Sequence, residues 1–126
     1  MNNNFVRGSE WRKWDLHVHT ASSYDAYKGE DADIILCEQL KENEVAVVAI
    51  TDHFLIDKAR IEKLRTLASD IVFFPGVELR TDKGSCNIHI ILIFPLEADL
   101  KNLEEDNKRL KAKNKELKNK LLELNK

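Results

Sequence analysis

The first hydrophobic pattern in the chain is the alternation expected of a β-strand. In the stretch WDLHVHT, residues 14–20, Leu16 and Val18 alternate with His17 and His19. Because successive side chains of a strand point to opposite faces, the two imidazoles lie side by side on one face. Two such histidines can be metal ligands, or polar strand residues that hydrogen-bond to backbone or water. The choice between these interpretations depends on the rest of the chain.

Strand and helix patterns then alternate along the sequence. Residues 31–44 and 57–68 repeat apolar residues at helical spacing, whereas the continuous apolar run 45–50 predicts a strand covered on both faces. Residues 71–81 and 87–94 are predicted as two more strands. This order is typical of right-handed βαβ units, so residues 1–95 are expected to form an α/β sheet or barrel. The core-facing residues of the two helices are expected to be Ile34, Ile35, Cys37 and Leu40, and Ile61, Leu64, Leu67 and Ala68.

The pattern changes at about Pro95, where a seven-residue leucine repeat begins. This repeat predicts a coiled-coil helix over residues 96–126, with Leu96, Leu103, Leu110, Leu117 and Leu124 at d and Leu100, Asn107, Asn114 and Leu121 at a. The alternative is a low-complexity tail rich in lysine and asparagine.

The orientation of this coiled coil stays open at the level of sequence. Asparagine at a often selects a parallel dimer, in which Asp106 would meet Lys111. In that arrangement, however, Asp99 would face Glu104 and Lys113 would face Lys118. An antiparallel pair brings Asp99 near Lys120 and Asp106 near Lys113.

Composition restricts the functional classes further. The chain has 126 residues and a net charge of −2, and its tail mixes nine basic with seven acidic residues, so binding to nucleic acid through the tail ranks lowest. No apolar run approaches the roughly 20 residues of a membrane span. The polar start MNNNFVRGSE predicts a cytoplasmic protein. Two cysteines without CxxC spacing give no disulfide framework or cysteine zinc site, and Cys37 is expected to be a small buried hydrophobe.

Polar side chains follow three successive predicted strands. His17 and His19 end the first strand, His53 follows the second beside Asp52, and Glu78 lies near the end of the third. Parallel α/β folds carry their functional groups at this end of the strands. Imidazole and carboxylate ligands together suit Zn, Mn or Fe.

A fifth candidate ligand comes from the expected hairpin. If Lys83 and Gly84 close the turn, Glu78 lies opposite His89. Opposed residues have Cβ atoms about 4.5–5.5 Å apart, close enough to bind one cation. The alternative is a histidine buried and satisfied in the core.

Together, DLHVHT, Asp25, ITDH, PGVE and a downstream histidine resemble the PHP (polymerase and histidinol phosphatase) family over about residues 5–95. The resemblance implies a distorted (β/α)7 barrel, up to three divalent metals and hydrolysis of phosphate esters. It makes Asp15 and Asp52 the residues that hold the imidazoles in their ligating form. The implied metal ligands are His17, His19, Asp25, His53, Glu78 and His89.

The later motifs of that family, a further histidine and a paired Asp and His, do not occur in this sequence. The expected fold is therefore a partial, truncated (β/α)7 barrel followed by a coiled-coil helix, binding one to three Mn, Zn or Fe ions. The expected function is a metal-dependent phosphoesterase acting on a phosphorylated substrate, with nucleic acid only as a substrate. Its activity is expected to be reduced or absent, because the later ligand motifs do not occur. The rival is a non-catalytic oligomerisation or regulatory module.

Two partner predictions complete the sequence-based account. The heptads predict a homo-oligomer formed through residues 96–126. The stretch RGSEWRKWDLHVHT also resembles the start of proteins in which a PHP domain precedes an ATPase region, so an ATPase partner is expected.

Overall fold

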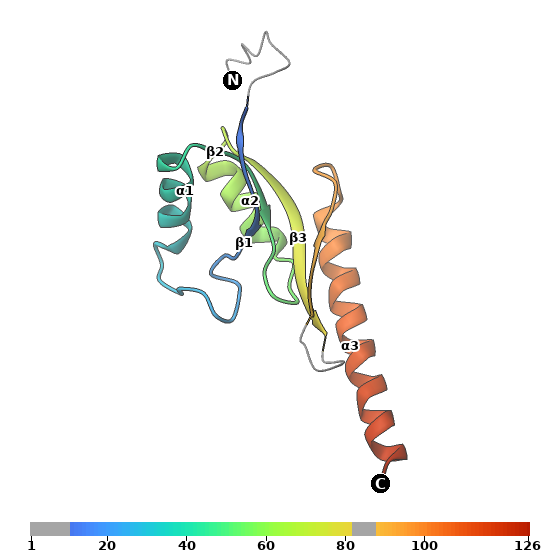
Figure 1. The fold of residues 1–126 in the computed structure, drawn as a ribbon. Helices are drawn as coiled ribbons and strands as arrows, with labels where there is room; N and C mark the ends of the chain where they lie inside the picture. Colours follow the sequence, from blue (N-terminus) through green and yellow to red (C-terminus); the bar gives the residue numbers. More distant parts are fainter. Residues whose placement is uncertain (1–10, 82–87) are drawn as a thin grey trace.

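A computed structural model describes residues 11–81 and 88–126. The strands and helices predicted within residues 1–95 are confirmed, with ends shifted by one or two residues. Figure 1 shows their arrangement. The elements are β1 (Lys13–Val18), α1 (Ala32–Glu42), β2 (Val45–Ile50), α2 (Lys58–Leu67), β3 (Val72–Thr81), β4 (Ile88–Ile93) and α3 (Leu100–Leu124).

The four strands form one curled sheet in the order β1-β2-β3-β4 (Figure 1). The pairs β1–β2 and β2–β3 are parallel, and β4 runs antiparallel to β3. The expected partial (β/α)7 barrel is therefore wrong, because the described residues form only a half-barrel sheet with three helices. The physical reason is that β3 is followed directly by β4 without a crossover helix, so the second strand can pair only in the antiparallel direction.

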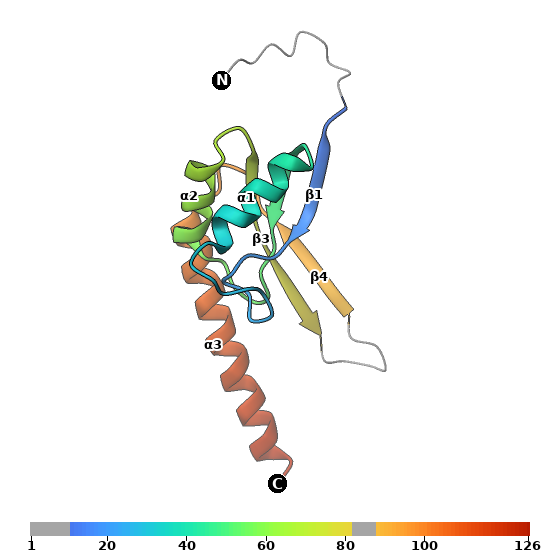
Figure 2. The ribbon, with the colours of Figure 1, turned by 90° about the vertical axis from the view of Figure 1, so that its left-hand side faces the viewer.

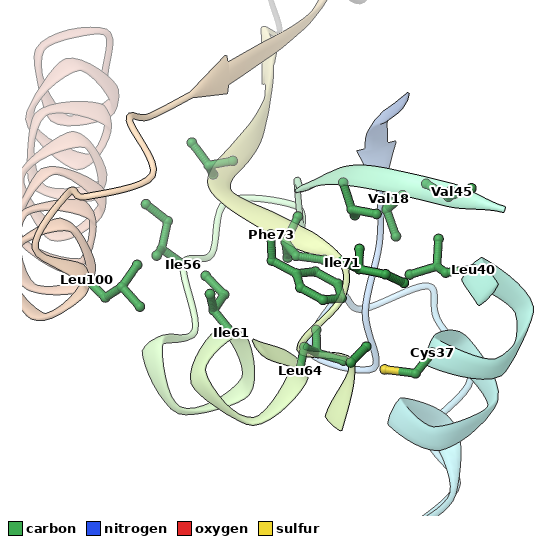
Figure 3. Close-up of a cluster of buried hydrophobic side chains, with 14 residues drawn as sticks. Val18, Cys37, Leu40, Val45, Ile56, Ile61, Leu64, Ile71, Phe73 and Leu100 are labelled. Atoms are coloured by element: carbon green, nitrogen blue, oxygen red, sulfur yellow. The ribbon is translucent and has the colours of Figure 1, made fainter. Parts of the chain in front are cut away.

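Helices α1 and α2 cover one face of the sheet (Figure 2). The aromatic ring of Phe73 lies at the centre of the core beneath them, flanked by Ile61 and Leu64 of α2 (Figure 3). Burial of each such side chain stabilises the fold by about 1.5–3 kcal/mol. Of the side chains expected to face the core, Cys37, Leu40, Ile61, Leu64 and Ala68 are buried, whereas Ile34, Ile35 and Leu67 are exposed.

A buried carboxylate joins α1 to α2. Asp33 accepts hydrogen bonds from Lys63 Nζ at 2.7 Å and from the Arg60 guanidinium. Burial opposes ionisation of Asp33, but the bonds from Lys63 and Arg60 outweigh it and lower the pKa of this carboxyl. The two helices are thus held by charge as well as by apolar packing.

Helix α3 begins in the core and ends outside it. Asp99 caps its first turn by accepting the Asn102 N–H, and Leu100 is buried in the same apolar cluster as Ile61. The second half of α3 projects past the end of the sheet (Figures 1 and 2). The coiled coil stays a prediction. No helix among the described residues is both long and apolar enough to cross a membrane.

Candidate metal centre

The centre is built around one buried carboxylate, that of Glu78. Alternation along β3 turns Val77 toward the helices and Glu78 toward the opposite face, where Glu78 is only 1% exposed. Gly76, two residues before Glu78, allows β3 to approach β2 and β4 closely. A Cβ at Gly76 would lie 2.7 Å from the Leu92 carbonyl oxygen and 2.9 Å from that of Ile50, on the two neighbouring strands. Glycine at this position therefore fits β3 tightly between β2 and β4.

The two histidines of WDLHVHT contact this carboxylate. Glu78 Oε2 lies 2.9 Å from His17 Nε2 and 2.7 Å from His19 Nε2, and the two imidazole nitrogens are 3.2 Å apart. Val18 between them points into the core. The strand alternation predicted from sequence thus places both imidazoles on the face that carries Glu78.

These three atoms have the spacing of ligands that share one cation. Zn–N and Zn–O bonds of about 2.0–2.2 Å place neighbouring ligand atoms about 3 to 3.5 Å apart. The three distances among His17, His19 and Glu78 fall close to this range. Two nitrogens and one carboxylate oxygen also match the ligand types that Zn, Mn and Fe accept.

A second group of candidate ligands adjoins the first. His53 Nε2 lies 3.2 Å from Asp25 Oδ2, and His19 Nδ1 lies 3.6 Å from Asp25 Oδ1. The ligand atoms of His19, Asp25 and His53 lie within 4.8 Å of one another. His19 belongs to both groups, so the two candidate sites are neighbours.

A buried nitrogen of His53 tests whether these residues fit a cation. Its Nδ1 atom is buried, has no hydrogen-bond partner within the described part of the chain, and lies 3.6 Å from Glu78 Oε2. A buried polar atom without a partner costs about 1–3 kcal/mol. Coordination of a cation by this nitrogen would remove that cost, so the residues present fit a metal.

Backbone hydrogen bonds fix the end of β2 beside Glu78. Glu78 N donates to the Asp52 carbonyl at 3.1 Å, and Phe54 N donates to the Glu78 carbonyl at 2.9 Å. Phe54 has a φ of 55°, a conformation that a bulky residue rarely adopts. On the other side, Asn107 Nδ2 of α3 donates to the Phe54 carbonyl at 3.0 Å. The segment 52–54, which carries His53, is therefore hydrogen-bonded to both β3 and α3.

The two residues expected to hold the imidazoles bond to other groups. Asp52 accepts from Thr20 N at 2.6 Å and from Thr20 Oγ1 at 2.7 Å, and burial raises the pKa of its carboxyl. Asp15 Oδ1 accepts from His17 N at 3.2 Å. Asp52 thus connects the end of β1 to the end of β2, and Asp15 supports the backbone of β1.

His89 reaches the centre from β4. Its Nδ1 lies 2.5 Å from Glu78 Oε1. The predicted pairing of Glu78 with His89 is wrong, because Glu78 pairs with Ile91 and His89 pairs with Arg80. A shift of two residues keeps a side chain on the same face, so the contact forms diagonally.

Electrostatics keep Glu78 ionised. Burial opposes its ionisation, but hydrogen bonds with His17, His89 and His19 outweigh burial and lower the pKa of Glu78 to about 2. Asp25 also has a lowered pKa, chiefly because the Ser23 side chain hydrogen-bonds to it. The centre therefore offers two carboxylates that carry negative charge at neutral pH.

Three residues that support the centre were not predicted from the sequence: Thr20, the last residue of WDLHVHT, and Ser23 and Tyr24, which follow it. Thr20 bonds to Asp52, and Ser23 Oγ accepts from His53 N at 3.4 Å. Thr20 and Ser23 are both buried. The Tyr24 ring lies 4.9 Å from the His53 ring, measured between centroids. Their position at the end of DLHVHT or just after it was the available signal, although their residue types alone did not distinguish them from solvated residues.

Comparison with known proteins gives a structural likeness but no family. No family model and no curated protein matches the chain, so membership of the PHP family stays a prediction. Among solved structures, the chain is similar to an amidohydrolase from Chromobacterium violaceum, solved with bound sulfate and without metal. The sequence identity is 26% and the TM-score is 0.51. The match covers 71% of this chain and 32% of that one, so this chain spans about a third of the amidohydrolase's length.

Proposed function

We propose that the chain is a metal-dependent hydrolase whose metal centre is assembled around Glu78. The observation that carries the proposal is the buried Glu78 carboxylate, which contacts three imidazoles while the nearby His53 Nδ1 has no partner among the described residues. The likeness to an amidohydrolase supports the same reaction class.

The candidate ligands divide by their accessibility. Glu78 and His53 are buried and would hold a cation from below, whereas the side chains of His17, Asp25 and His89 are 51%, 45% and 44% exposed. When bound, a divalent cation supplies a Lewis acid that activates water and polarises a substrate oxygen. The exposed ligands leave one side of the centre open to a substrate.

The proposed substrates are phosphate esters. Two adjacent candidate groups share His19, and paired cations suit phosphoryl transfer because they stabilise both the attacking and the leaving oxygen. The PHP-like motifs favour the same substrate class. The amidohydrolase likeness makes amide hydrolysis the competing reaction, so both substrate types belong in the test.

The proposal is tested on the purified full chain by metal analysis and a hydrolysis assay. The chain is loaded separately with Mn, Zn and Fe and assayed on a phosphomonoester, a phosphodiester and an anilide. We expect bound metal and phosphoester turnover in the wild type, and loss of both in Glu78→Gln. Glu62→Gln is the matched control, because Glu62 is exposed on α2, away from the centre.

Each outcome of this assay bears on a different part of the proposal. Turnover of the anilide alone would replace phosphate esters by amides as the substrate class. Absence of both metal and turnover in the wild type would contradict the hydrolase itself and favour the rival, a non-catalytic oligomerisation module. The exposed leucines of α3 are the observation that supports this rival. The ATPase partner and the cytoplasmic location stay predictions.

A further inference from the structure

Helix α3 carries an apolar seam that the described part of the chain leaves uncovered. Within the first half of the helix, Leu100 is buried and Leu103 packs against the core. Beyond them, Leu110, Leu117 and Leu121 on the same seam are 61%, 51% and 60% exposed, and Leu124 is also exposed. Contiguous exposed apolar residues of this kind mark an interaction surface.

An open apolar groove lies beside this seam. It has a volume of about 640 Å³, and β3, β4 and α3 form its walls. Ile90 and Leu92 of β4 line it and are each 41% exposed. Leu103 and Leu110 of α3 line the opposite side, so the groove is continuous with the seam.

Charge is strongly segregated along the same helix and its approach. Residues 97–106 contain five acidic residues and one basic residue, whereas residues 107–126 contain eight basic and two acidic residues. Two copies aligned in parallel would place the basic segments against each other. An antiparallel alignment instead places the basic segment of each copy along the acidic segment of the other.

We propose that a second copy of this chain covers the seam and the groove, with the two α3 helices antiparallel. In this dimer, the projecting half of each α3 runs along the partner's groove, and Leu117 packs at the end of the groove that Leu103 of the partner subunit lines. Asp106 of each copy then lies near Lys113 of the other, and Asp99 near Lys120. The occupant is thus a second α3, whose exposed leucines and basic charge complement the groove and the acidic segment beside it.

The position of the α/β unit, formed by β1–β4 with α1 and α2, also favours an antiparallel pair of α3 helices. In the first half of α3, the seam faces the α/β unit. Leu100 and Leu103 pack against its core, and Asn107 donates a hydrogen bond to the Phe54 carbonyl. A parallel pair joined by this seam would place both units in the same space between the helices. In an antiparallel pair, each unit faces the projecting half of the other helix, and the units lie at opposite ends.

The first test is the mass of the full chain in solution, measured by light scattering after size-exclusion chromatography. The expected mass is twice the 14.6 kDa of one chain. The double variant Leu117→Glu, Leu121→Glu is expected to be monomeric with unchanged circular dichroism, because both residues lie outside the core. Asn119→Glu, on the outer side of the helix, is the control and should stay dimeric. A monomeric wild type, or a double variant that stays dimeric, would overturn the proposal.

The second test separates the two orientations. In the antiparallel dimer, Lys113→Glu faces Asp106 and should raise the dissociation constant roughly tenfold. Asp106→Lys should weaken the dimer as well, and combining both changes should restore it. In a parallel dimer Lys113 would lie near Lys118, so Lys113→Glu would tighten association. Tighter association of Lys113→Glu in sedimentation equilibrium, or failure of the combined variant to recover, would overturn the antiparallel arrangement.

Discussion

The Glu78 centre and the projecting half of α3 differ in what surrounds them. Glu78 is in contact with side chains from β1 and β4 and with the segment that follows β2, all within one copy of the chain. Among the described residues, the leucines at the end of α3 are largely exposed. The candidate metal centre thus brings together residues from distant parts of the chain, whereas the longest helix presents an apolar seam suited to a second molecule.

The largest expected effect comes from removing the centre of the core. Phe73→Ala should lower the free energy of unfolding by about 3–5 kcal/mol, because Phe73 is 1% exposed and its loss leaves a cavity. Urea unfolding followed by circular dichroism measures the change. A decrease in the free energy of unfolding below about 1 kcal/mol would contradict the close packing of Phe73 in the core.

An intermediate effect is expected from the charged link between α1 and α2. Asp33→Asn should lower the free energy of unfolding by about 1–3 kcal/mol at pH 7, because Arg60 and Lys63 lose their shared carboxylate. The pKa of Asp33 is lowered in the folded chain. Its contribution is therefore fully present above the pKa of the unfolded chain and is lost as the pH falls through the folded value.

The measurement for this variant is unfolding at a series of pH values. The difference between wild type and Asp33→Asn should be largest near neutral pH and shrink as the pH falls below about 4. A difference that grows with acidity would have the opposite sign and would contradict the ion pair.

The smallest effect is expected on the projecting half of α3. Leu122 is 65% exposed and lies beside the seam, not on it. Leu122→Ala should change the free energy of unfolding by less than about 0.5 kcal/mol, measured by the same urea method. A loss close to that of Phe73→Ala would show that this half of the helix is packed as tightly as the core.

The individual strands and helices were predicted well from the sequence, but the way the strands assemble into a sheet was not. The apolar run 45–50 matches β2, and the alternation in WDLHVHT places His17 and His19 on one face, because periodicity reports directly on which sides of an element are buried. The barrel prediction failed since it came from a family resemblance, whereas the chain places β4 directly after β3.

In the candidate site, too, the positions of residues at strand ends were predicted, whereas contacts that depend on register or loop folding were not. The positions of His53 and Glu78 followed from the rule that parallel strands end at one edge of the sheet, and the two residues do lie together. The pairing of Glu78 with His89 needed the register of a hairpin, which sequence alone does not fix. The hydrogen bonds from Thr20 to Asp52 depend on how the loop after β1 folds back. The spacing of apolar residues carries no information on the path of that loop.

The most direct test of the central claim is metal binding measured by isothermal titration calorimetry. Zn or Mn is titrated into the wild type, Glu78→Gln and the control Glu62→Gln. The account predicts at least one site in the wild type and the control, and at least a tenfold loss of affinity in Glu78→Gln, since Glu78 lies at the centre of the imidazole cluster. Equal affinity in all three proteins, or no binding by the wild type, would contradict it.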